Sequence, residues 1–147
     1  MSKTIWIIVV FIAGALLPIQ AGLNSRIGKE IQSPFWASLF SFGVGLIAMA
    51  GYVLLTKQKM NIAGVSNIPL TYWVAGALGA FYITVMVLAF PKIGAPMAFG
   101  LIVAGQLTIS LLLDHYKILV QQQHAINMYR LLGMLLIVCG VILIRKF

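Results

Sequence analysis

Charged side chains are scarce in this sequence, and their scarcity excludes an ordinary soluble domain. Only 8% of the 147 residues are charged, whereas 62% are hydrophobic. A soluble domain has about 25% charged and about 45–50% apolar residues. A soluble core cannot bury so large an excess of apolar side chains, so we expect lipid to surround most of the chain.

Acidic residues are rarer still. Glu30 and Asp114 stand against ten Lys and Arg, which gives a net charge of +8. In a soluble protein this balance would suggest a nucleic-acid partner. Here the basic residues are spread singly near the ends of apolar runs, where they would lie beside lipid headgroups. We therefore expect the lipid bilayer as a partner and no nucleic acid.

Residues suited to metal binding or catalysis are also few. The chain has one cysteine, Cys139, and two histidines, His115 and His124. A single cysteine cannot form an internal disulfide, and these three residues make no zinc-binding set. The sequence also has no Ser/His/Asp set, no phosphate-cradling glycine loop and no paired carboxylates. We expect no metal, no cofactor and no enzymatic activity.

Long apolar runs are what the sequence does have, and they predict an all-α integral membrane protein. A helix needs about 20 apolar residues to cross a bilayer. Five such runs fit into one membrane domain over residues 1–147, and Ser33-Pro34 is a good N-cap and first-turn proline for the second. The five transmembrane helices are predicted at residues 4–23, 34–55, 69–90, 95–113 and 129–144.

The basic residues are divided equally between the two predicted membrane faces. Five spans place the chain ends on opposite faces, and the positive-inside rule needs a charge bias to fix an orientation. The even division favours insertion in both orientations, although features such as loop length could still fix one. One face carries Lys3, Lys57, Lys59, Lys117 and Arg130, and the other carries Arg26, Lys29, Lys92, Arg145 and Lys146.

Several polar and aromatic side chains fall within or beside the predicted helices, and we interpret them as candidates for substrate binding. An unpaired polar group is costly at membrane depth, so each needs a partner or a ligand. The alternatives are a bond between helices for glutamine, a bond within the helix for Ser, and an interfacial aromatic belt for Trp and Tyr. The candidates are Gln20, Asn24, Ser41, Trp73, Tyr82, Gln106 and Ser110.

Four ionisable residues near helix ends are candidates for gating or energy coupling: Glu30, Asp114, His115 and Arg130. Asp114 and His115 follow the fourth predicted helix, and Arg130 begins the fifth on the same face. The alternative interpretation is a structural ion pair between Asp114 and Arg130. Glu30 could be a solvated loop residue, or could face a vestibule if the first helix continues beyond Leu23.

Two segments resemble the drug/metabolite transporter (DMT) superfamily. Residues 87–98, Val-Leu-Ala-Phe-Pro-Lys-Ile-Gly-Ala-Pro-Met-Ala, resemble its helix–turn–helix, in which small residues follow a Pro-x-Gly-type turn. The final helix, residues 133–144, resembles that of small multidrug resistance proteins. The whole chain is most similar to the YdcZ-like five-helix family of inner-membrane exporters. The motifs that carry this similarity are Pro18, Gln20 and Asn24, Ser33-Pro34, Gly105-Gln106 with Asp114-His115, and Arg130 with Gly133.

The resemblance implies half of a ten-helix transporter, in which two five-helix halves of inverted topology enclose a central cavity. The second half would come from another copy. An antiparallel homodimer in a bacterial inner membrane would then export a small-molecule substrate, a metabolite or a drug, by alternating access. A heterodimer with an oppositely oriented paralogue and a non-transporting accessory subunit are the alternatives.

One departure from the resemblance bears on the substrate. Small multidrug resistance proteins use a glutamate in the first helix to exchange protons for cationic drugs. The first predicted helix here has no acid, and only Gln20 lies near that region. An uncharged cavity would favour neutral, zwitterionic or amphipathic substrates, because a cation would lack a partner charge.

Overall fold

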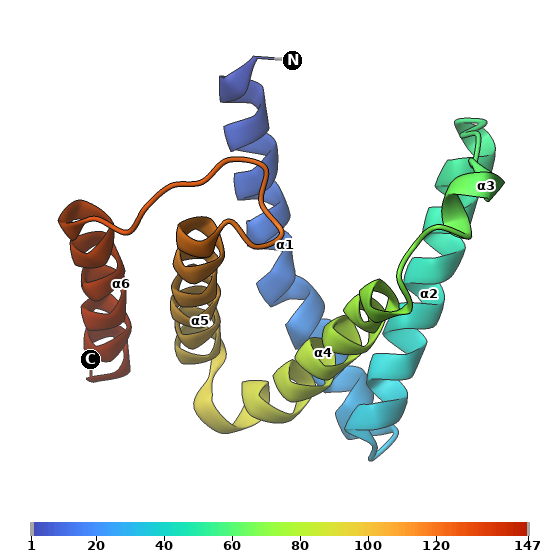
Figure 1. The fold of residues 1–147 in the computed structure, drawn as a ribbon. Helices are drawn as coiled ribbons and strands as arrows, with labels where there is room; N and C mark the ends of the chain where they lie inside the picture. The colour runs from blue at the N-terminus through green and yellow to red at the C-terminus, as the bar shows by residue number, and fades with distance from the viewer. Residues whose placement is uncertain (1, 147) are drawn as a thin grey trace. The chain divides into compact units, whose positions relative to one another are not determined.

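The computed structural model describes residues 2–146, which form helices joined by turns and loops, and no strand occurs in that part of the chain (Figure 1). The predicted all-α class is therefore confirmed. The elements are α1 (Lys3–Glu30), α2 (Pro34–Leu55), the short α3 (Ile62–Val65), the 3-10 helix η1 (Leu70–Trp73), α4 (Val74–Ile93), α5 (Ala95–Tyr116) and α6 (Met128–Lys146).

The helices have lengths and compositions suited to a membrane. Over residues 2–146, four segments are long and apolar enough to cross a bilayer: α1, α2, η1 together with α4, and α5. The apolar part of α6, Met128–Ile144, is shorter. Since about 17–25 apolar residues span a bilayer, α6 lies at the lower end of this range. The structure agrees with the predicted integral membrane protein of about five helices.

The first helix is longer than the sequence predicts. Leu23 is its predicted end, but α1 has 28 residues and continues to Glu30. The polar stretch after Leu23 mixes good helix formers, Arg26, Lys29 and Glu30, with poor ones, and the close contact of Gly28 with α2 and α4 also favours its helical conformation. At 1.5 Å per residue, a helix of this length measures about 42 Å, against about 30 Å for the hydrocarbon layer. The helix is therefore longer than the hydrocarbon layer is thick, and in a membrane it must tilt or extend beyond that layer.

Local backbone geometry sets two of the helix boundaries. Ser33 Oγ accepts a hydrogen bond from Trp36 N over 3.4 Å, which confirms the predicted N-cap of α2. Gly94 separates α4 from α5 with a φ of 78°, a conformation that favours glycine. Pro91 lies inside α4, so that helix ends at Ile93 and not at the predicted residue 90.

The chain divides into two compact units, of which the first ends at Pro91 and the second begins at Lys92. The first contains α1, α2, α3, η1 and nearly all of α4. The second contains α5, α6 and the loop between them. The single membrane domain stays a prediction.

Small residues allow the helices of the first unit to meet. Its first two helices form an antiparallel pair (Figure 1). A Cβ on Gly28 of α1 would lie 3.5 Å from Ala37 Cβ of α2 and 3.1 Å from Val87 Cγ1 of α4. Three helices therefore converge at this glycine, and a methyl group there would require Val87 to shift by a few tenths of an ångström.

The second unit is an antiparallel helix pair (Figure 1). A Cβ on Gly100 of α5 would lie 2.6 Å from Val141 Cγ2 of α6, so a side chain larger than hydrogen does not fit there without movement. Thr108 Oγ1 of α5, which donates to Ala104 O of its own helix over 2.8 Å, also lies 3.5 Å from Met134 Sδ of α6. Close packing of a small residue thus holds the pair together, as is usual in lipid.

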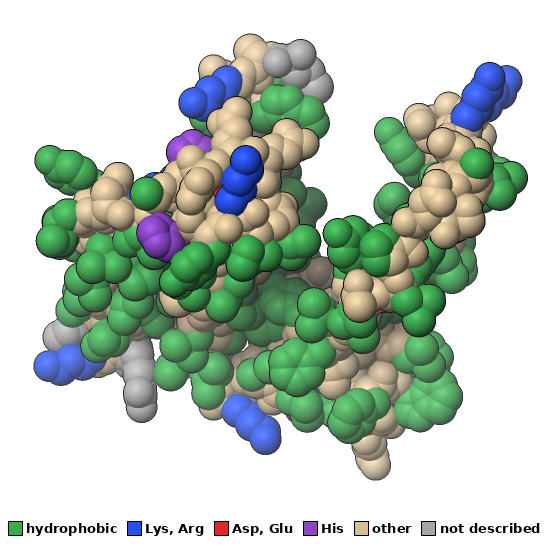
Figure 2. Space-filling model, in the orientation of Figure 1, with side chains coloured by type: hydrophobic (Ala, Val, Ile, Leu, Met, Phe, Trp, Pro, Cys, Tyr) green, Lys and Arg blue, Asp and Glu red, His purple; other side chains and the backbone are tan. Residues whose placement is uncertain are grey.

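A single copy buries very little of its apolar surface. The buried hydrophobic residues in the described part of the chain are Ala21, Ala37, Met86, Val87, Ala98 and Val141. Much larger side chains are exposed, including Phe11 at 76% and Ile47 at 75%. Figure 2 shows hydrophobic side chains over much of the visible surface of both units. Lipid or a second protein surface must cover them.

Candidate functional site

A small cavity in the first unit brings together three of the predicted substrate-binding residues. It lies between α1 and α4, and its polar lining comes from Gln20 and Asn24 of α1 and Tyr82 of α4. Its volume is about 10 Å³. That is close to the smallest space that holds one water molecule. The cavity in a single copy is therefore a polar contact point and not a complete pocket for a small molecule.

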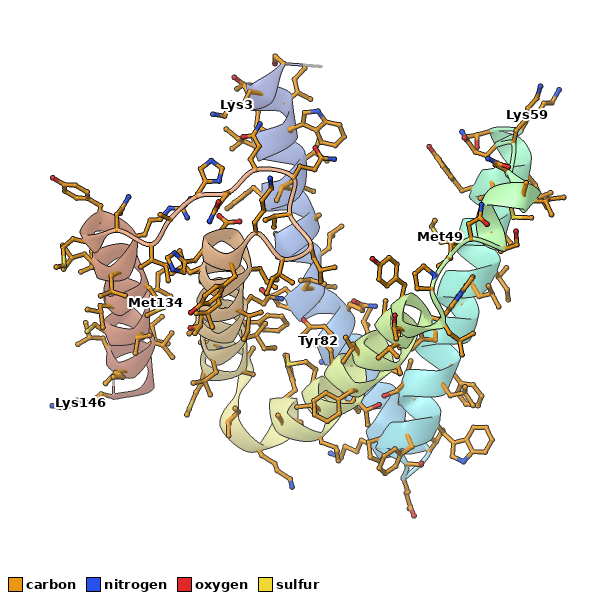
Figure 3. The ribbon with its side chains drawn as sticks, in the orientation of Figure 1. Lys3, Met49, Lys59, Tyr82, Met134 and Lys146 are labelled. Carbon is orange, nitrogen blue, oxygen red and sulfur yellow. The ribbon has the colours of Figure 1, made fainter. Side chains whose placement is uncertain are left out.

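Helical spacing explains why these residues share the cavity. Leu17, Ala21 and Asn24 are three or four residues apart and therefore lie on one face of α1. Tyr82 and Met86 are four apart on α4 and line the opposite wall. Figure 3 shows Tyr82 where α4 passes α1. The apolar members of both sets surround the polar groups with hydrocarbon.

Asn24 is the most deeply buried polar residue of the cavity. Its side chain is 6% exposed, and its Nδ2 donates a hydrogen bond to Ser41 Oγ of α2 over 3.0 Å. This bond joins two predicted site residues and fixes the amide group. Because Nδ2 is the donor, the carbonyl oxygen Oδ1 stays available as an acceptor.

Gln20 and Tyr82 have polar groups that are free to bind a ligand. Within residues 2–146, neither the Gln20 amide nor the Tyr82 hydroxyl makes a hydrogen bond. Thr84, two residues after Tyr82, differs because its Oγ1 donates to Ala80 O on the same helix over 2.8 Å. Gln20 is exposed, so the cavity reaches the surface of the unit at this residue.

The remaining substrate-binding candidates lie elsewhere. Trp73 is in η1 and is 59% exposed. Gln106 and Ser110 are exposed on α5, in the second unit. Their part in binding stays a prediction. No charged side chain of the described chain lines the cavity, and Glu30 is exposed at the end of α1.

An ion pair joins the end of α5 to the start of α6. Arg130 Nη1 lies 3.2 Å from Asp114 Oδ2, and both side chains are partly exposed, at 30% and 23%. The same nitrogen donates to His124 O over 3.1 Å, and His124 N donates to Asp114 O over 3.3 Å. The structural ion pair considered from the sequence is therefore present, while a role in gating stays a prediction.

The loop between these helices is also tied to His115. Ile126 N donates to His115 Nδ1 over 3.3 Å, and Gln123 Nε2 donates to His115 O over 2.7 Å. Three of the four predicted gating residues, Asp114, His115 and Arg130, therefore belong to one network. The fourth, Glu30, is in the first unit.

Sequence reasoning missed Gln123 and His124, whose contacts depend on how the loop folds. Lys117 and Leu119 have φ values of 55° and 61° and turn the chain back toward α5. Positive φ is uncommon outside glycine. Neither residue is of a type that favours it, so the sequence carries no signal for this fold-back.

The sequence matches known membrane proteins along nearly its whole length. Residues 5–143 match the profile of a family described as "Putative inner membrane exporter, YdcZ". The chain is 26% identical over 146 residues to the "Inner membrane protein YdcZ" of Escherichia coli (strain K12), which covers 98% of this chain and 92% of that protein. No solved structure matches it. The matched range contains the cavity and the Asp114–Arg130 network.

Proposed function

We propose that this chain, which belongs to the YdcZ family of the drug/metabolite transporter superfamily, is one half of a carrier that exports small molecules from bacteria. Family membership confirms the resemblance carried by the sequence motifs. The apolar helices and the inner-membrane relative also support the predicted multi-pass location in a bacterial inner membrane.

The cavity lined by Gln20, Asn24 and Tyr82 carries the proposal. Polar groups without partners are costly among apolar helices, and they are retained where a ligand or a passing solute satisfies them. Binding pockets for small molecules have volumes of about 300–1,000 Å³. The cavity of one copy has about 10 Å³, so a substrate needs a larger space than one copy provides.

A second copy would supply this space and cover the exposed helices. Few apolar residues are buried in the described part of one copy, and many large apolar side chains are exposed. The ten basic residues divide evenly between the two predicted faces, which is compatible with insertion in both orientations. We therefore place two oppositely oriented copies around one central site. Rocking of one copy against the other would expose the site to each side of the membrane in turn.

Transport is tested with the purified protein in liposomes. The liposomes are loaded with a defined mixture of amino acids, nucleosides, sugars and aromatic amides, and mass spectrometry measures what remains inside. We expect the protein to release some members of the mixture with saturable rates, while protein-free liposomes retain them. A protein that releases nothing from this mixture would favour the accessory-subunit alternative.

The arrangement of the copies is tested by crosslinking in lipid. Cys139 is first replaced by Ala, and two differently tagged variants, Lys3→Cys and Ile144→Cys, are then expressed together. Opposite insertion places the start of one copy level with the end of the other. We expect crosslinks between the two variants. Crosslinks only within each variant population would mean parallel association and would direct attention to a separate partner protein.

A further inference from the structure

The hydrogen-bonding groups of the cavity, above all the side-chain amide of Asn24, restrict which ligands can bind there. Asn24 is more than nine-tenths buried, and Ser41 occupies its Nδ2 group. In the described chain no donor reaches Asn24 Oδ1, although the residue lines the cavity. Among the described residues no buried side-chain oxygen lacks a partner, so Asn24 Oδ1, which accepts no hydrogen bond there, keeps some accessible surface. An accessible carbonyl oxygen on a residue that is otherwise buried can accept an N–H or O–H donor from outside the protein.

Charge restricts the ligand further. The described lining contains amide, phenol and hydrocarbon groups but no carboxylate, ammonium, guanidinium or imidazole. Glu30 is six residues beyond Asn24 on α1, which is about 9 Å along the helix. A cation or an anion would lose its hydration here without gaining an opposite charge, and that loss is large among apolar side chains. The site therefore favours an uncharged ligand.

The apolar side chains that line the cavity indicate that the ligand also has an apolar part. Leu17 on α1 and Met86 and Val87 on α4 present hydrocarbon beside the three polar groups. An apolar body can pack against them while a polar end reaches Asn24. Tyr82 and Gln20 can then bind a second polar atom of the ligand, since a phenol and a carboxamide both donate and accept.

We propose that this cavity recognises an uncharged small molecule that donates an N–H or O–H hydrogen bond to Asn24 Oδ1 and packs an apolar group against α1 and α4. The proposal deepens the proposed transport function, because the second copy provides the space that one copy lacks. A single bound water would satisfy Asn24 Oδ1 equally well, and the experiment is designed to separate the two.

The experiment compares three benzene derivatives of similar size. Benzamide is uncharged and has amide N–H donors, N,N-dimethylbenzamide is uncharged without them, and benzamidine has the donors but carries a positive charge. The full chain in lipid nanodiscs is labelled with ¹⁵N on asparagine, and the side-chain amide signals are followed by NMR. The chain has four asparagines, so Asn61, Asn67 and Asn127 provide internal references. The Asn24 signal is identified by its loss in Asn24→Leu.

We expect benzamide alone to shift the Asn24 signal in a saturable way. A titration to about 10 mM covers a dissociation constant of about 1 mM, a weak affinity suited to a small fragment. Thr84→Val removes a hydroxyl that is already bonded within its own helix, so this control should bind benzamide as the wild type does. Asn24→Asp should reverse the selectivity by at least tenfold in favour of benzamidine, because it introduces a carboxylate.

Three results would overturn the proposal. Equal shifts with N,N-dimethylbenzamide would show that no donor is needed, and equal shifts with benzamidine would show that charge is not excluded. An unchanged Asn24 signal with all three compounds would leave a water molecule as the only occupant. Export by liposomes combined with an unchanged Asn24 signal would reject this site and keep the transport function. A specific benzamide shift without any export would keep this binding site and reject the transport function.

Discussion

Arg130 on α6 and Asp114 on α5 approach within 3.2 Å across a loop of eleven residues, Lys117 to Asn127, that is bonded to the same two helix ends. Arg130 holds both the carboxylate of Asp114 and the backbone carbonyl of His124. The pair therefore fixes the path of the loop as well as the spacing of the helices.

Exchange of the two charges should separate a structural role from a functional one. Asp114→Arg and Arg130→Asp, made singly, should each lower the free energy of unfolding by about 1 kcal/mol, the scale of a partly exposed ion pair with one added hydrogen bond. The double variant should recover most of this loss. Thermal unfolding in nanodiscs measures stability, and export measures function. Recovered stability without recovered export would assign the pair a direct part in gating.

Gly100 should be intolerant of any side chain. Gly100→Ala places a methyl group against Val141 and should destabilise the α5–α6 pair by about 1–3 kcal/mol, the usual cost of overpacking. Gly105→Ala on the same helix is the matched control, because nothing lies within 4 Å of its Cβ position. Adding Val141→Ala to Gly100→Ala should restore stability. Equal effects of the two glycine substitutions would contradict the close approach of the helices.

The bond between Asn24 and Ser41 should stabilise the first unit. Ser41→Ala leaves the Asn24 Nδ2 group without a partner, and such a loss costs about 1–3 kcal/mol. Ser38→Ala on the same helix is the control, since Ser38 Oγ donates only to Pro34 O of its own helix over 2.9 Å. Thermal unfolding should separate the two variants. Unchanged stability of Ser41→Ala would mean that this bond does not help to hold α1 and α2 together.

Both orientations should be found in the cell. The C-terminus is fused to a fluorescent protein that matures only in the cytoplasm, or to a phosphatase that is active only outside it. We expect both fusions to be active. Replacing Asn61 and Asn67 by Lys adds charge to one predicted face and should leave one active fusion. Activity from a single fusion of the wild type would reject dual insertion.

The sequence predicts the helices well because their lengths follow from bilayer thickness. It places the start of α2 at Ser33-Pro34 correctly, since a capping serine and a first-turn proline act locally. The predicted end of the first helix at Leu23 is wrong, because the helical backbone continues after the apolar run has stopped. Hydropathy alone cannot distinguish a helix that leaves the lipid from a helix that ends there.

The candidate site is predicted in part. Polar residues in apolar runs identify Gln20 and Tyr82, the family resemblance adds Asn24, and the structure brings these three together. Their contact could not be derived from the sequence, because it depends on how α4 packs against α1. The loop contacts of Gln123 and His124 are beyond sequence reasoning, since they depend on two backbone conformations unusual for their residues.

The 28-residue length of α1 couples this protein to the thickness of its membrane. A helix of about 42 Å must tilt or protrude in a hydrocarbon layer of about 30 Å, and the balance shifts when the lipid chains lengthen or shorten. Asn24 lies in the last third of that same helix. A change in the length of the lipid chains would therefore alter how deep the Asn24 side chain lies in the membrane.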